Sequence, residues 1–310
     1  MIGRIVEVAD DRRHLFVHRG FMVVQDTDGE RKELGQIPLD DIAAVIGNAH
    51  GLSYTNNLLV ALSERGAPFV LCSANHNAVG MVLPIDGNYE QAKRIDAQIA
   101  ASQPTHKRMW AAVVRSKLEQ QAAALEAAGA PTAPLSALVG KVRSGDPDNV
   151  EAQGARRYWG LLFPENFKRD QTASGINSLL NYGYTVLRAT TARAVIAAGL
   201  HPSIALHHSN ANNAMRLVDD LMEPFRPMID LKVWQLLHND ETEVTPDTKR
   251  ALVRVMYDDM QTDAGSTPVT VCTQRLATSL AQVYLGERDK LDLPLPGLPL
   301  TLAASLRDDE

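Results

Sequence analysis

The sequence predicts an α+β fold, with a small β-rich N-terminal domain followed by a larger all-α catalytic domain. Two observations lead to this prediction. Short β-branched runs separated by turn residues fill residues 1–84, with one helical stretch among them. From residue 85 on, apolar residues recur at helical spacing almost to the end of the chain. We expect a linker at 85–95 and the helical domain at 96–310.

The N-terminal domain is predicted from four runs rich in Val and Ile. The segment 26–31 between the second and third runs contains Asp28-Gly29, a pair typical of hairpin turns. One helix, expected at 56–65, interrupts the strands. The expected strands cover residues 2–8, 15–24, 37–46 and 69–72.

The helical domain also carries signals for helix ends. Thr245-Pro246 is typical of a helix start, because threonine caps the helix and proline fits its first turn. Gly286 lies where a glycine ends a helix. Residues 122–137, rich in Ala and Pro, are expected to be a mobile connection, and a Pro-rich tail is expected from Leu291 on. The expected helices cover residues 91–103, 105–128, 150–163, 176–199, 214–223, 228–238, 247–260 and 268–285.

The composition restricts the class of protein. The chain has 310 residues, a formal net charge of −6, 45% hydrophobic and 22% charged residues, which excludes wholesale disorder. Cys72 and Cys272 are its two cysteines, so we expect a reducing, cytoplasmic location without a disulfide framework. No signal peptide is expected, and no apolar run reaches the about 18 residues of a membrane span. The acidic balance argues only weakly against nucleic-acid binding, because the distribution of charge matters more than its sum.

The candidate functional residues begin with Glu151 and a pair of histidines. Glu151 lies in the first turn of a predicted helix, where it could simply form a capping pair with Asp148. His207 and His208 end an apolar run and enter a polar loop. Neighbouring side chains point in different directions, so at most one histidine easily serves a given site. The alternative is one hydrogen-bonded core histidine and one solvated histidine.

Three acidic residues crowd one helix end. Asp219, Asp220 and Glu223 lie within five residues, and like charges so spaced repel. Pro224 places Glu223 at or near the end of the helix, where the helix dipole is also negative. A divalent cation would relieve this repulsion, and a solvated acidic face is the alternative. One histidine with two or more carboxylates suits Mg²⁺ or Mn²⁺ better than zinc, and it indicates metal-assisted phosphoryl chemistry.

Four sequence motifs surround these residues: EAQGARRYW at 151–159, SLLNYGYTVLRA at 178–189, GLHPSIALHH at 199–208 and DDLMEPFRPMID at 219–230. In these motifs the sequence resembles the Cas-one family of CRISPR-associated integrases, which insert new spacers. The combination of NYGY in the second motif with DDLMEPFRP in the fourth is specific to this family. The end of the chain, 280–294, and the segment 79–94 also fit it.

The resemblance implies a metal-dependent DNA integrase and endonuclease of CRISPR adaptation and antiviral defence. Such an enzyme inserts short foreign DNA fragments into a CRISPR array by 3′-hydroxyl transesterification. The implied partners are double-stranded DNA, as spacer precursor and repeat, and a small protein, Cas-two, that bridges two homodimers. The β-domain is the expected dimer surface. The details resemble the variant that accompanies a single-protein effector nuclease (type II-like), which makes that nuclease a further candidate partner.

The resemblance also assigns site residues. It implies that Glu151, His208 and Glu223 are catalytic and bind Mg²⁺ or Mn²⁺, with His208 rather than His207 as the ligand. Many relatives carry aspartate at the position of Glu223, so the longer side chain is a departure from the family pattern. Asp220 matches an auxiliary acid on the same helix.

Basic residues near these motifs are candidates for contacts with DNA phosphates. For any single one of them, a solvated surface position is the alternative, and Arg226 could instead pair with Asp230. From a second helix, Asn181 and Tyr182 either support the site or serve packing. The candidate DNA-binding residues are Arg156, Arg157, Lys168 and Arg226.

Two other functions use the same residues differently. A stand-alone, structure-specific DNA nuclease would share the metal site and use water in place of the 3′-hydroxyl. A non-catalytic scaffold would keep the acidic cluster as a solvated face.

Overall fold

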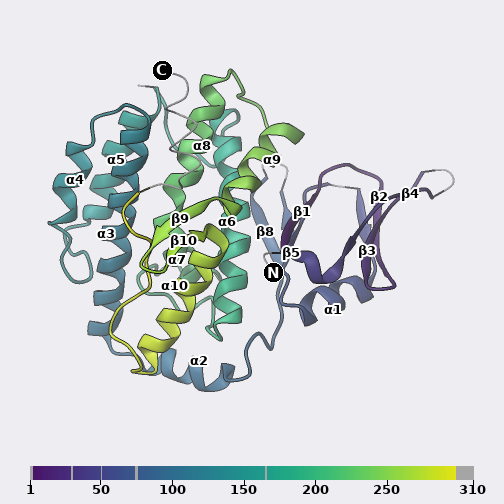
Figure 1. Ribbon diagram of the computed structural model, residues 1–310, viewed down its shortest axis with the longest axis horizontal. Coiled ribbons are helices and arrows are strands. Elements are labelled where there is room, and N and C mark those ends of the chain that lie inside the picture. Colours follow the sequence, from purple (N-terminus) through teal and green to yellow (C-terminus); the bar gives the residue numbers. More distant parts are fainter. Residues whose placement is uncertain (1–2, 29–30, 50, 74–75, 165, 298–310) are drawn as a thin grey trace.

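The computed structural model describes residues 3–28, 31–49, 51–73, 76–164 and 166–297. Its N-terminal strands precede a mostly helical region, which confirms the predicted α+β class (Figure 1). The N-terminal elements are β1 (Arg4–Val8), β2 (Arg13–His18), β3 (Phe21–Asp26), β4 (Glu33–Pro38), β5 (Ile42–Gly47), β6 (Leu52–Tyr54), α1 (Asn56–Glu64), β7 (Phe69–Cys72) and β8 (Ala78–Val82).

The strands form two four-stranded sheets, with orders β1-β5-β7-β8 and β4-β3-β2-β6. Every residue of β5 is buried, because both faces of the first sheet are covered. On one face Ala44 and Ile46 join the core of the helical region. On the other face Ile42 and Val45 pack against the second sheet and α1. The first sheet therefore lies between the helical region on one face and the second sheet with α1 on the other.

Two of the expected strands are each divided in the structure. The run 15–24 folds into the hairpin β2–β3, because Arg19 and Gly20 take positive φ values of 48° and 83°. Turns with positive φ match the twist of paired strands. The run 37–46 is split by a 3-10 turn at Leu39–Asp41. The predicted turn at 26–31 lies partly outside the described residues.

The helices follow the predicted pattern closely, with ends that differ by a few residues. Between β8 and the tail the structure contains α2 (Gln91–Ala100), α3 (Gln103–Ala127), α4 (Ala133–Val139), α5 (Val150–Leu162), α6 (Ile176–Ala197), α7 (Arg216–Met222), α8 (Arg226–His238), α9 (Pro246–Arg254) and α10 (Val269–Tyr284).

Two predictions for this region are wrong. The segment 122–137 is not a mobile connection, since α3 runs into it and α4 begins within it, with Leu135 fully buried. The helix expected at 247–260 ends at Arg254, and a hairpin of β9 (Asp259–Thr262) and β10 (Gly265–Pro268) follows. Gly265, with a φ of 95°, lies at its turn, a conformation that glycine adopts readily.

The central helix α6 organises the helical region (Figure 1). It is buried along most of its length and packs against α7, α8, α9, α10 and β5. At Gly183 a Cβ atom would come within 2.4 Å of Ile229 on α8, so this glycine permits a close approach of the two helices. This packing fixes the junction of α7 and α8, where the three acidic residues lie. No helix within the described ranges is long and apolar enough to cross a membrane.

Candidate metal and nucleic-acid site

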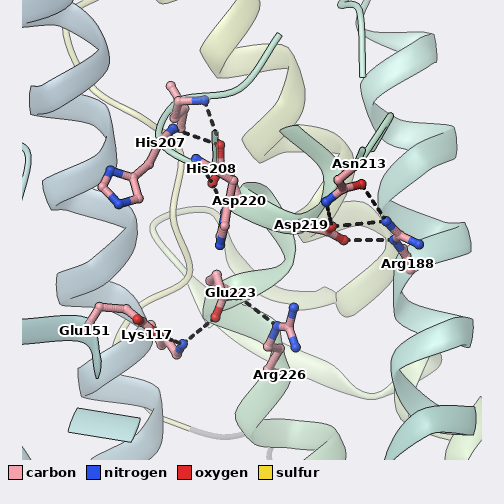
Figure 2. Close-up of polar contacts among 11 residues, drawn as sticks. Lys117, Glu151, Arg188, His207, His208, Asn213, Asp219, Asp220, Glu223 and Arg226 are labelled. Atoms are coloured by element: carbon pink, nitrogen blue, oxygen red, sulfur yellow. Dashed lines mark hydrogen bonds and ion pairs between the residues drawn. The ribbon is translucent and has the colours of Figure 1, made fainter. Parts of the chain in front are cut away.

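Glu151 is the second residue of α5, and other residues cap this helix. The carboxylate of Asp146 accepts hydrogen bonds from the first two backbone N–H groups of the helix, at 2.8 and 3.0 Å, and the side chain of the N-cap residue Asn149 accepts one from the third. Asp148 pairs with Arg143 on the surface instead, so the predicted capping pair of Asp148 and Glu151 is wrong. The Glu151 side chain points toward α3 (Figure 2).

The three acidic residues of the α7–α8 junction do not form a solvated face. Asp220 is fully buried and Glu223 is 6% exposed. As expected, α7 stops before Pro224, and a 3-10 turn over Glu223–Phe225 connects it to α8. Asp219 pairs with Arg188 at 2.8 Å, so each of the three acids has its own set of partners. The solvated-face alternative is therefore excluded for Asp220 and Glu223.

Asp220 orients His208. Its carboxylate accepts hydrogen bonds from the backbone N–H groups of Leu206 and His207, at 2.7 and 3.1 Å. It also lies 2.5 Å from Nδ1 of His208, and this hydrogen bond raises the pKa of the imidazole. In the neutral ring this carboxylate favours the proton on Nδ1, which leaves the Nε2 lone pair for a ligand. Histidines that bind metals usually have their other ring nitrogen bound to a carboxylate in this way.

His207 has a different environment. Its ring stacks on Trp110 of α3 with a centroid distance of 4.5 Å and parallel planes. Figure 2 shows it pointing toward α3, whereas His208 lies beside Asp220 above Glu223. The two histidines therefore have different neighbours, and His208 is the one that a buried carboxylate orients.

Lys117 of α3 joins the two glutamates. Its ammonium group donates a hydrogen bond to Glu151 and lies 2.5 Å from Oε2 of Glu223 (Figure 2). Nε of Arg226 lies 3.1 Å from the other oxygen of Glu223. Burial acts to raise the pKa of Glu223, but the charges of Arg226 and Lys117 outweigh it and hold this pKa below its ordinary value. Glu223 is therefore ionised in spite of its burial.

A cavity of about 220 Å³ opens at these residues, and the cationic side chains of Lys117, Arg169 and Arg226 line it. The guanidinium groups of Arg226 and Arg169 lie 4.8 and 5.5 Å from the ring centre of Tyr184. The Tyr184 hydroxyl donates a hydrogen bond to the buried Asp230. Carboxylates and guanidinium groups thus face one small polar space, an arrangement suited to a phosphate group and a cation.

The donor set fits a hard divalent cation. Glu151, Glu223 and His208 offer two carboxylates and one neutral nitrogen, as expected for Mg²⁺ or Mn²⁺. Oε2 of Glu223 is buried, and among the described residues it has an ion pair but accepts no hydrogen bond. Within the described ranges, no group of three or more His, Cys, Asp or Glu side chains is arranged to hold a metal ion, and Lys117 contacts both glutamates.

The remaining predicted residues are dispersed around this site. Arg156 and Lys168 are exposed, and the exposed Arg157 donates a hydrogen bond to a backbone carbonyl. Arg226 lies within the site itself rather than on an outer surface. Among the predicted supporting residues, Asn181 accepts a hydrogen bond from Arg169 at 2.7 Å.

Tyr182 contacts the N-terminal strands. Its hydroxyl group donates a hydrogen bond to Glu7 of β1 at 2.9 Å. Lys249 of α9 forms an ion pair with the same glutamate. Tyr182 therefore contributes to the contact between α6 and the N-terminal strands.

Sequence reasoning overlooked Lys117, Tyr184 and Asp230 as parts of this site. Lys117 lies on the same helix as the exposed Lys107, Arg108 and Arg115, and only its burial distinguishes it from them. Tyr184 and Asp230 lie inside the matched motifs, so proximity to the acidic cluster was a usable signal. The pairing of Tyr184 with Asp230 depends on the packing of α6 against α8.

The role of Asp220 leads to a prediction for metal affinity. In Asp220→Asn the uncharged amide holds the His208 proton less firmly and leaves backbone N–H groups with a poorer acceptor. We expect Mn²⁺ affinity to fall by about 10- to 100-fold, as is typical when a partner of a metal ligand is lost. Titration of Mn²⁺ followed by electron paramagnetic resonance measures this. Unchanged affinity would show that Asp220 serves only the fold.

Asp230 leads to a prediction for stability against pH. Burial raises its pKa from 3.8 to about 7, against the opposing effects of Tyr184 and Arg226. The folded state therefore holds a proton that the unfolded state loses between these values, and stability falls as pH rises through that window. The slope is at most about 1.4 kcal/mol per pH unit.

We expect Asp230→Asn to remove this contribution. Thermal melting in EDTA between pH 4.5 and 7 should show the wild-type protein losing stability relative to the variant. Parallel melting curves across that range would contradict the raised pKa of Asp230.

The sequence of this chain is similar to those of known CRISPR-associated proteins. A family model described as CRISPR associated protein Cas1 matches residues 6–259. The CRISPR-associated endonuclease Cas1 of Neisseria meningitidis is 34% identical over 269 residues, which cover 85% of this chain and 88% of the relative. A CRISPR-associated endonuclease Cas1 of Pyrobaculum aerophilum is 26% identical and covers 89% of this chain and 98% of its own length.

Solved structures share the fold at low sequence identity. A casposase bound to an integration product has a TM-score of 0.79 and 19% identity, with 93% of this chain and 92% of that chain covered. A Cas1 protein from Thermotoga maritima has a TM-score of 0.73 and 16% identity, with 93% and 99% covered. The matched family model and the relative from Neisseria meningitidis cover most of the sequence. This chain belongs to the Cas1 family of CRISPR-associated proteins.

Proposed function

We propose that this protein is a metal-dependent DNA integrase and endonuclease that inserts short foreign DNA fragments into a CRISPR array. The observation that carries the proposal is the small polar cavity that Glu151 and Glu223 line together with Arg169 and Arg226, with His208 above Glu223 (Figure 2). Membership of the Cas1 family supports it, since the curated relatives are named CRISPR-associated endonucleases. The casposase with the same fold was solved with an integration product.

In the proposed reaction a 3′-hydroxyl of the incoming DNA attacks a phosphodiester at the repeat border. The new P–O bond forms as the bond to the leaving 3′-oxygen breaks, so the number of phosphodiester bonds is unchanged. Glu151, His208 and Glu223 would hold Mg²⁺ or Mn²⁺. When bound, such an ion stabilises charge on the phosphate and lowers the pKa of a hydroxyl group.

The chain's own residues have separate parts in this proposal. Asp220 keeps His208 in the tautomer that presents Nε2. Arg169 and Arg226 would bind the non-bridging oxygens of the phosphate, where fixed positive charge stabilises the transition state. Burial of Glu223 excludes water from one side of the site, and water in place of the 3′-hydroxyl would give cleavage instead of joining.

The partners are part of the proposal. We propose double-stranded DNA as spacer precursor and repeat, with Arg156, Arg157 and Lys168 as outer phosphate contacts around the site. One active site joins one strand at a time, so we also propose a homodimer and a small partner, Cas2, that bridges two dimers. One chain of a Cas6-RT-Cas1–Cas2 complex shares the fold with a TM-score of 0.76, and the match covers 96% of this chain and 36% of that chain. The type II-like variant and its effector nuclease belong to the same proposal.

The test is a joining assay with purified protein, its Cas2 partner, a short duplex with 3′-hydroxyl ends and a supercoiled plasmid that carries a repeat. We expect covalent joining in Mn²⁺ or Mg²⁺ and none in EDTA. A duplex with 3′-dideoxy ends is the matched control and should give no joined product.

The alternatives give different products in the same assay. Plasmid cleavage without joined DNA would favour the stand-alone nuclease. The absence of any reaction with folded protein in either metal would contradict the enzyme and favour a scaffold.

A further inference from the structure

The proposed metal site contains a cation that belongs to the protein. Lys117 lies within α3, and its side chain is 8% exposed. The ammonium group contacts Glu151 of α5 and, at 2.5 Å, Glu223, whose side chain is 7% exposed. Three segments far apart in the sequence thus meet at one buried nitrogen (Figure 2).

The charges around this nitrogen explain its position. Glu223 is buried and Glu151 is 27% exposed, and two carboxylates brought together where water has limited access are unfavourable unless a cation lies between them. Arg226 neutralises one oxygen of Glu223, at 3.1 Å, but the oxygen that faces Glu151 depends on Lys117. In the arrangement observed, the lysine is therefore the counter-ion of the glutamate pair.

A divalent ion and this ammonium group would compete for the same oxygens. Like charges a few ångströms apart repel strongly in a site shielded from water. Oε1 of Glu151 and Oε2 of Glu223 both face the lysine nitrogen, which leaves no separate position between them for a metal. Gln121, one turn along α3, lines the same cavity, and its Oε1 has no hydrogen-bond partner within the described part of the chain. It gives a displaced ammonium group a buried acceptor.

We infer that Lys117 is a resident counter-cation of the Cas1 site, which stabilises the metal-free protein and is displaced when the divalent ion binds. This inference rests on the proposed function, because it takes Glu151 and Glu223 as metal ligands. It assigns Lys117 the role of a positioning residue that sets metal affinity. The metal-free protein keeps the two carboxylates together at the cost of weaker metal binding.

The test replaces Lys117 by methionine, which has a similar length and no charge. Mn²⁺ binding is followed by electron paramagnetic resonance, and thermal melting is recorded in EDTA. We expect Lys117→Met to bind Mn²⁺ at least about tenfold more tightly, because no internal cation has to be displaced first. In EDTA its melting temperature should fall by on the order of 10 °C, since the buried Glu223 and the partly buried Glu151 lose a shared counter-ion.

Lys249→Met is a matched control. Lys249 forms an ion pair with Glu7 at 2.8 Å, and the two side chains are 11% and 13% exposed, but the pair lies between α9 and the N-terminal strands. We expect this variant to lower the melting temperature without changing Mn²⁺ affinity. The control thereby separates a general loss of stability from an effect on Mn²⁺ affinity.

A second variant covers the case in which Lys117→Met does not fold in EDTA. Recovery of its folded state by Mn²⁺ would support the inference, because the metal then supplies the missing charge. Lys117→Arg keeps the charge and should bind Mn²⁺ no more tightly than the wild-type protein.

The inference is overturned if Lys117→Met binds Mn²⁺ no more tightly than the wild-type protein, or if Lys117→Arg binds it more tightly. Glu223→Gln distinguishes this failure from failure of the metal site. If Glu223→Gln abolishes Mn²⁺ binding while Lys117→Met has no effect, only the role of Lys117 fails. If wild-type binding does not depend on Glu223, both proposals fail.

Discussion

Glu223→Gln is expected to lower the rate of DNA joining by at least about 10³-fold, because several kcal/mol of transition-state stabilisation depend on a correctly held metal. The amide keeps the size of the side chain but removes the charge of a residue that is 6% exposed. The buried ammonium group of Lys117 retains Glu151 as a partner, so the variant should remain folded. Single-turnover joining and a melting curve measure the two properties separately.

A surface acid near Glu151 provides the control for Glu223→Gln. Asp148 lies on the surface with Arg143 as its ion-pair partner. Exposed pairs of this kind contribute little to stability. Asp148→Asn should therefore join DNA at nearly the wild-type rate. Equal losses in Asp148→Asn and Glu223→Gln would indicate a general effect of negative charge. Undiminished joining by Glu223→Gln would show that Glu223 is not part of the catalytic site.

The two neighbouring histidines should give unequal losses. His208→Ala removes the ring that Asp220 orients, and we expect joining to fall at least about 100-fold, as for loss of a group that organises a metal site. His207→Ala removes a stacking contact with Trp110, which is worth about 0.5–1.5 kcal/mol, and should cost at most about tenfold.

Joining rates of both histidine variants, measured at saturating Mn²⁺ and again at limiting Mn²⁺, provide the comparison. The His208→Ala defect should be larger at limiting metal, because the residue binds the ion. Equal losses in the two variants, or a loss in His207→Ala alone, would contradict the assignment of His208. Because His207→Ala loses the stacking on Trp110, we expect this variant to have a lower melting temperature.

Much of the fold was predictable because local signals determine it. Pro224 ends α7 at Met222, and Thr245-Pro246 begins α9, as the sequence indicates. The hairpin of β9 and β10 was not predictable in the same way, because its strands are four residues long and follow a helical pattern without a break. The split of the run 15–24 depends on positive φ at Arg19, which an arginine does not signal.

The candidate site was predictable only in part. The resemblance supplied Glu151, His208 and Glu223, and the structure brings the two glutamates together from α5 and the α7–α8 junction. The partners of these residues depend on tertiary packing. The spacing of Lys117 on α3 does not distinguish a buried counter-ion from a surface lysine, and nothing in the sequence shows that Tyr182 reaches Glu7.

The central claim is that Glu151, His208 and Glu223 hold the catalytic metal. Anomalous diffraction at the manganese edge, from crystals soaked in Mn²⁺, tests it most directly. We expect a single strong peak bounded by Nε2 of His208 and the carboxylates of Glu151 and Glu223, with the Lys117 ammonium moved away. A peak elsewhere would contradict the claim, whereas a peak at this position with Lys117 still between the two glutamates would contradict only the role of Lys117.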